Sequence, residues 1–72
     1  MRPSQLSNTL RVERARRDWT QADLAERVGV TRKTINTIEN GRFVPSTILA
    51  LQLAKVFDAS VEDLFRLDET PV

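Results

Sequence analysis

Apolar residues recur along this chain at intervals of three and four positions, the spacing that places side chains on one face of an α-helix. No stretch of five or more residues alternates apolar and polar side chains between turn residues, so the pattern predicts no β-strand. We therefore expect an all-α fold, a five-helix bundle, with helices within residues 5–17, 21–28, 32–40, 47–57 and 61–67.

Residues typical of helix ends mark the borders of these segments. Thr20 with Asp23, and Ser60 with Asp63, have the spacing of a capping box, in which side chain and backbone at a helix start bond reciprocally. Gly29 is suited to the left-handed residue that ends one helix, and Thr31 can cap the next.

Two of the segments have clear inward faces. In the first we expect Leu10, Val12 and Ala15 to point into the bundle and the arginines to point outward. The fourth is apolar over more than half of its circumference, and Ile48 and Leu51 fall opposite its inward face. With Phe65 and Leu67 they predict a self-complementary patch joining two copies of the chain. The alternative is that the last helix covers them.

Helices 21–28 and 32–40 are joined by only three residues, a connection that favours a steep crossing. At 100° per residue, Ile35 and Ile38 lie on the buried side of the second of these helices. Its outward face carries Lys33, Asn36, Thr37 and Asn40, flanked by Arg32 and Thr34. All six side chains can donate hydrogen bonds and none is acidic, as entry into the major groove of DNA requires.

Arg32 and Lys33 occupy the first turn of that helix. The helix dipole disfavours an exposed cation there by about 0.3–1 kcal/mol. Two adjacent violations of a local rule indicate a functional cause. A phosphate or a base edge would make both charges favourable.

Composition narrows the possible functions. The 72 residues include no Cys and no His, which removes thiolate and imidazole metal ligands and the commonest catalytic side chains. We therefore expect neither an enzyme nor a metal or cofactor site, and no small-molecule ligand is evident. Residues 1–42 hold nine Arg and Lys against five Asp and Glu, whereas residues 43–72 hold two against five. The basic half suits a nucleic-acid partner.

No apolar run approaches the roughly 20 residues that a membrane span needs. The beginning of the chain, MRPSQLSNT, also lacks the apolar stretch of a secretory signal. We expect no membrane partner and a cytoplasmic location.

The stretch TQADLAERVGVTRKTINTIENG, followed by a Pro-Ser helix start, resembles the helix-turn-helix domain of the phage repressor family, Cro/C1-type or Xre. The resemblance covers about residues 8–66 and is greatest to small stand-alone transcriptional regulators of bacteria and archaea. It implies a single domain over residues 1–72, with its core at about 8–66 and flexible ends, and a helix-turn-helix at 21–40.

The resemblance also implies roles for individual residues. Base edges would be read by Arg32, Lys33, Asn36 and Thr37. Phosphates would be held by Gln21, Thr31, Thr34, Asn40 and Arg42. Arg14 and Glu39 would form a structural ion pair.

On this interpretation the chain is a homodimeric transcriptional regulator, expected to be a repressor, that binds an inverted-repeat operator in double-stranded DNA. Two alternatives stay open. The same domain occurs in antitoxins and in restriction-modification controllers, and it can serve as a protein-interaction adaptor. An adaptor would depend little on Arg32 or Lys33.

Overall fold

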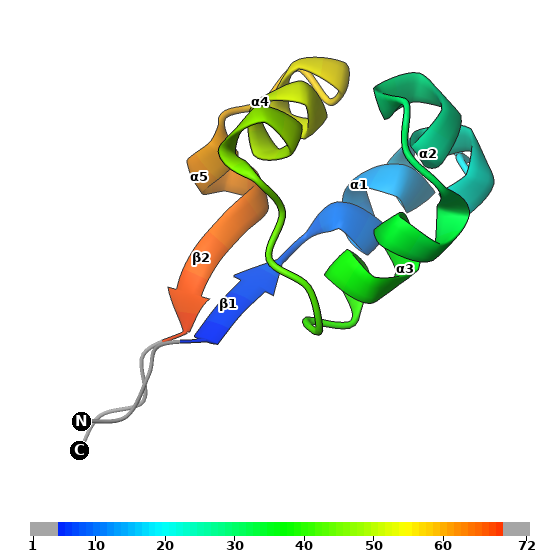
Figure 1. The fold of residues 1–72 in the computed structure, drawn as a ribbon. Coiled ribbons are helices and arrows are strands. Elements are labelled where there is room, and N and C mark those ends of the chain that lie inside the picture. The colour runs from blue at the N-terminus through cyan, green and yellow to red at the C-terminus, as the bar shows by residue number, and fades with distance from the viewer. Residues whose placement is uncertain (1–4, 69–72) are drawn as a thin grey trace.

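The computed structural model describes residues 5–68, in which five helices and a two-stranded sheet enclose one hydrophobic core (Figure 1). The mostly helical architecture with five helices is confirmed, and the sheet is an addition to it. The elements in chain order are β1 (Gln5–Asn8), α1 (Leu10–Arg16), α2 (Gln21–Val28), α3 (Arg32–Glu39), α4 (Thr47–Val56), α5 (Val61–Leu64) and β2 (Phe65–Asp68).

The two strands correct the prediction for both ends of the fold. β1 and β2 pair antiparallel, with Leu6 opposite Leu67 and Asn8 opposite Phe65. The first helix therefore begins at Leu10, and the last ends at Leu64. Each strand has four residues, too few for alternation to be recognisable, and the pairing joins opposite ends of the chain. The flexible ends expected from the sequence fall partly on residues 1–4 and 69–72, which lie outside the described residues.

The inward face of α1 also differs from the prediction. Leu10 is buried, but Val12 and Ala15 are exposed. The inward positions that follow Leu10 at helical spacing are Arg14 and Arg17, both of which bond to groups elsewhere in the fold. A rule that places only apolar residues inside cannot recognise a face that is partly built from arginine.

Helix α4 presents the predicted face to the core, where Leu49, Ala50, Leu53, Ala54 and Phe57 are buried. Phe57 stacks on Trp19 with 5.6 Å between ring centroids. Two guanidinium groups complete this cluster, that of Arg27 at 4.1 Å from the Trp19 ring and that of Arg17 at 5.0 Å from the Phe57 ring. The cluster fixes α1 and α2 against the end of α4.

The start of α2 is capped as the sequence predicts. The backbone N–H of Asp23 donates to Thr20 Oγ1 at 3.0 Å, and the Asp23 carboxylate accepts from the Thr20 backbone N–H at 2.9 Å. Ser60 and Asp63 form the equivalent capping box on α5. These bonds satisfy donors that a helix start leaves without partners in the helix.

Candidate nucleic-acid interface

The turn between α2 and α3 brings these two helices into contact through their buried faces (Figure 1). Gly29 ends α2 with φ of +74°, a left-handed conformation that a side chain would strain. The backbone N–H of Val30 then donates to the Ala25 carbonyl at 3.0 Å, and Thr31 caps α3. Ile35 and Ile38 are buried, so the opposite face of α3 is left for solvent.

That solvent face carries most of the side chains predicted to read DNA. Arg32, Lys33 and Asn36 are exposed, and Thr37 is half-buried with its hydroxyl donating to the Thr34 carbonyl at 2.9 Å. Among the side chains of residues 6–67, no carboxylate lies within ion-pairing distance of Arg32 or Lys33. Their positive charge is therefore available to a ligand outside the chain.

The residues predicted to hold phosphates flank this face. The hydroxyl of Thr31 accepts from the Thr34 backbone N–H at 3.2 Å and lies 3.0 Å from the Thr34 hydroxyl, so both take part in capping α3. Arg42 is exposed immediately after Gly41, whose φ of +73° ends the helix. Thr31 and Arg42 thus lie at opposite ends of α3.

A buried carboxylate anchors α3 from behind. The Glu39 side chain is 0% exposed and accepts from Arg14 Nε at 2.6 Å and Arg14 Nη2 at 3.0 Å. Arg14 also donates to the Trp19 carbonyl at 2.9 Å, and Arg11 Nε lies 3.7 Å from Glu39. Burial raises the pKa of Glu39, but the hydrogen bonds from Arg14 and Gln21 and the charges of Arg14 and Arg11 outweigh it, and the net shift is downward.

We expect the free energy of unfolding to fall with acidification, partly through Glu39. Its pKa is lower in the folded chain than in the unfolded chain, where Glu titrates near about 4.3. Its contribution is fully present above that pH and is lost as the pH falls through the folded pKa. Urea unfolding between pH 6 and 2.5 would measure this loss.

The control for the acid measurement is Glu39→Gln, which should flatten the dependence without abolishing it. Asp23 and Asp63 also have lowered pKa values, because backbone N–H groups of Thr20 and Ser60 donate to them. An unchanged pH dependence in the variant would contradict the prediction.

The amides around α3 form a network that the sequence did not reveal. Gln21 Nε2 donates both to Glu39 Oε1 at 3.1 Å and to Asn36 Oδ1 at 3.2 Å. Asn40 Nδ2 donates to the same Asn36 oxygen at 3.3 Å. The four-residue spacing of Asn36 and Asn40 could have suggested their contact, but the contact with Gln21 crosses between helices.

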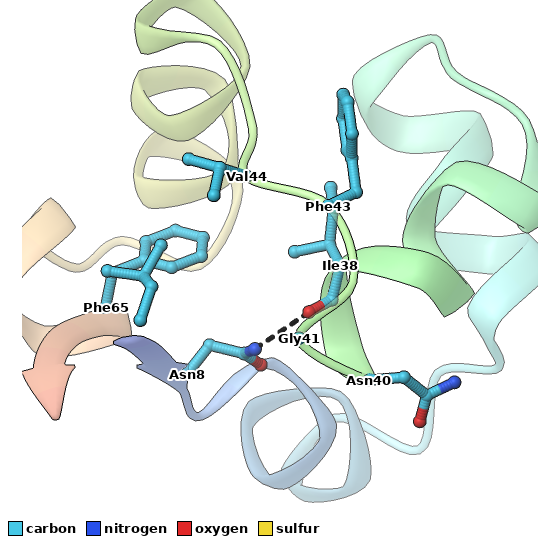
Figure 2. Close-up of a pocket in the computed structure, with 8 residues that line it drawn as sticks. Asn8, Ile38, Asn40, Gly41, Phe43, Val44 and Phe65 are labelled. Carbon is cyan, nitrogen blue, oxygen red and sulfur yellow. Dashed lines mark hydrogen bonds between the residues drawn. The ribbon is translucent and has the colours of Figure 1, made fainter. Parts of the chain in front are cut away.

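A shallow pocket of about 390 Å³ lies behind α3 and not on its solvent face. Figure 2 shows Phe43, Val44 and Phe65 around it, with the Asn40 side chain pointing away. The amide of Asn8 donates to the Ile38 carbonyl at 3.0 Å, which ties the end of β1 to the end of α3. The sheet therefore helps to hold α3 in place.

The four residues predicted to join two copies of the chain differ in their exposure to solvent. Phe65 is buried in the core, because β2 turns this residue inward, so it is removed from the patch. Ile48, Leu51 and Leu67 are 71%, 57% and 65% exposed. α5 leaves Ile48 and Leu51 uncovered.

None of the helices between Gln5 and Asp68 has the length and apolar character that crossing a bilayer requires. Over the same residues, no group of three or more acidic side chains gathers in a way that could hold a metal ion.

Two short helices joined by a glycine turn, the second with a cationic and amide-rich outer face, define the class of helix-turn-helix DNA-binding proteins. A family model described as helix-turn-helix matches residues 10–64, and the chain belongs to this family, of the Cro/C1 or Xre type. It is a DNA-binding transcriptional regulator, and its family is not one of enzymes, as the sequence indicated.

Over most of its length, the chain is similar to known transcriptional regulators. It is 45% identical over 64 residues to the uncharacterized HTH-type transcriptional regulator YgzD of Bacillus subtilis, covering 89% of this chain and 97% of that protein. An uncharacterized HTH-type regulator of Archaeoglobus fulgidus is 50% identical over 56 residues, 78% of this chain and 79% of that protein. The clp gene regulator ClgR from Corynebacterium glutamicum superimposes with a TM-score of 0.70 at 33% identity, over 76% of this chain and 58% of that one.

Proposed function

We propose that this regulator is a homodimeric repressor that inserts α3 of each copy into the major groove of an inverted-repeat operator. The solvent face of α3 carries the proposal. Arg32 and Lys33 are exposed there, with no carboxylate partner among the side chains of residues 6–67, beside the exposed amide of Asn36. A helix of this kind fits the major groove, where cationic and amide side chains can distinguish base pairs.

In this proposal the base readers are Arg32, Lys33, Asn36 and Thr37. Arg and Lys pair best with the two acceptors of guanine, and each good bidentate contact discriminates by about 1–3 kcal/mol. Thr37, whose hydroxyl proton is directed to the Thr34 carbonyl, retains a methyl group that suits thymine.

Phosphates on either side of the groove are held by residues at the two ends of α3 and by Thr34 in its first turn. Arg42 supplies a full charge, and Thr31, Thr34 and Asn40 supply polar groups. The side-chain N–H groups of Gln21 already have partners, so this residue contacts a phosphate through its backbone N–H, which lies in the first turn of α2. These contacts add affinity and orientation without choosing a sequence.

The exposed side chains of Ile48, Leu51 and Leu67 support dimerisation. A groove of about 220 Å³, lined mostly by apolar residues, lies beside Leu51 between α4 and the sheet. A second copy that packed on this surface would bury these side chains and place two α3 helices on one face of the DNA. Half-sites would then lie roughly 34–36 Å apart, one turn of the duplex.

Changing Leu51 to Lys should convert the dimer to a monomer, because a charge would then have to be buried in the interface. Sedimentation equilibrium of the full chain would measure this change. Arg66→Lys, which keeps the charge of an exposed residue on the sheet, is the control and should leave the dimer intact. A Leu51→Lys variant with the wild-type mass in solution would contradict this arrangement.

In this proposal, repression results from binding of the dimer to its operator. A dimer covering two successive turns of DNA within a promoter would exclude polymerase without any further domain. We place this activity in the cytoplasm, where it would have access to chromosomal DNA.

Selection from random duplexes, followed by sequencing of the bound fraction, tests the proposal. The expected result is an enriched inverted repeat whose half-sites are one helical turn apart, and a footprint that protects both. Affinity should fall steeply with salt, because phosphate neutralisation releases counterions, and Arg42→Ala should reduce the salt slope by about 1. Enrichment of no sequence, or of a single unrepeated site, would contradict the proposal.

A further inference from the structure

We infer that the buried Glu39 carboxylate, acting through Gln21, fixes the direction of the Asn36 amide, so that Asn36 reads DNA only as a hydrogen-bond donor. The inference deepens the proposed function and rests on it. It makes Gln21 a positioning residue, and it changes the base expected opposite Asn36.

Glu39 determines which groups donate and which accept in this hydrogen-bond network. Because its pKa is lowered, its carboxylate is ionised near neutral pH and can only accept hydrogen bonds. An amide has one donating and one accepting end, so Gln21 must turn its nitrogen toward Glu39, at 3.1 Å. The Gln21 oxygen in that place would meet a negative charge.

The Gln21 side-chain nitrogen then determines which end of the Asn36 amide faces it. Gln21 Nε2 has a second N–H group, and this group lies 3.2 Å from the Asn36 side chain. Only the oxygen of Asn36 can accept it. Asn40 adds a second donor to that oxygen at 3.3 Å, but it cannot set the direction, because its own amide is bonded to no charged side chain among residues 6–67. The fixed point is therefore Glu39.

An Asn36 side chain held in this way offers its NH2 group and not its oxygen to the groove. The usual pairing of Asn with adenine needs both ends, the oxygen for the N6 amino group and the nitrogen for N7. Guanine presents two acceptors, N7 and O6, and thymine presents O4, whereas adenine has its N6 donor beside the single acceptor N7, and cytosine presents only a donor. We therefore expect guanine or thymine opposite Asn36, with adenine disfavoured because two donors would face each other, and cytosine disfavoured most.

The test compares four full-length variants in the random-duplex selection. Asn36→Ala identifies the base position that Asn36 reads, because the preference there is lost. Asn36→Asp keeps an oxygen for Gln21 and Asn40 but replaces the outward donor with an acceptor. It should shift that one position toward cytosine, whose N4 group donates, by about fivefold or more.

Gln21→Met matches the length of the side chain but breaks the link to Glu39. Asn36 is then free to turn, and the preference at its position should move toward adenine, while the other positions and the salt slope remain as in the wild type. Gln52→Met, the same exchange at an exposed site on α4, is the matched control and should change nothing. Thermal melting of each variant verifies that the fold persists.

The outcomes separate this inference from the proposed function. A wild-type chain that selects an inverted repeat with adenine at the Asn36 position would overturn the inference alone. So would an unchanged preference in Gln21→Met. An Asn36→Ala variant that loses no position would overturn the inference and would also remove Asn36 from the base readers of the proposed function. A wild-type chain that selects no sequence would overturn both.

Discussion

Arg32→Ala and Lys33→Ala are each expected to weaken binding to the selected operator by about 5- to 150-fold, equivalent to 1–3 kcal/mol for one base contact. The same substitutions should leave the free energy of unfolding unchanged or raise it by about 0.3–1 kcal/mol, because each removes an exposed cation from the first turn of α3. Opposite effects on binding and stability distinguish a side chain retained for its ligand from one retained for the fold.

Fluorescence titration with the operator duplex and urea unfolding of the same preparations would measure both effects. Lys55→Ala is the matched control. Lys55 is an exposed cation outside α3, in the last turn of α4, and the helix dipole favours a cation at that end of a helix. The Lys55→Ala variant should bind normally. Variants at Arg32 and Lys33 that retain full affinity and sequence preference would instead favour an adaptor function.

The sequence predicted those elements whose signals are local. Thr20, Gly29 and Thr31 mark the limits of α2 and α3 through bonds and backbone angles within a few residues, and the structure contains each of them. The outer face of α3 follows equally from Ile35 and Ile38. Local signals of this kind are sufficient to predict which residues form the solvent face of the candidate interface.

The features that could not be predicted depend on residues far apart in the chain. β1 and β2 have the sheet hydrogen bonds of a strand through pairing with each other, and Phe65 is a core residue in the strand that follows the end of α5 at Leu64. Likewise, the contact of Gln21 with Asn36 depends on the angle between two helices and on the charge of Glu39. Helix geometry fixes the residues on a face but not the direction of an amide.

Arg14→Met is expected to lower the free energy of unfolding by about 3–5 kcal/mol, because it leaves the buried Glu39 charge with the neutral donor Gln21 and the exposed Arg11, whose Nε lies 3.7 Å away. For a chain of this length the whole free energy of unfolding is about 4–11 kcal/mol, so the variant should be close to unfolding at 37 °C. Urea unfolding at pH 7 would measure the loss, and lowering the pH should reduce it as Glu39 takes up a proton.

The double variant Arg14→Met with Glu39→Leu shows whether the loss comes from the stranded charge or from the missing arginine. Replacing both members of a buried ion pair with apolar residues is often neutral, so the double variant should be more stable than Arg14→Met alone. It should nevertheless lose the base preference assigned to Asn36, since Gln21 then has no charge to orient it. A double variant as unstable as the single one would place the effect in the bond from Arg14 to the Trp19 carbonyl instead. The Glu39 carboxylate thus affects both the stability of the fold and the base preference at Asn36. Comparing the single and double variants separates these two effects.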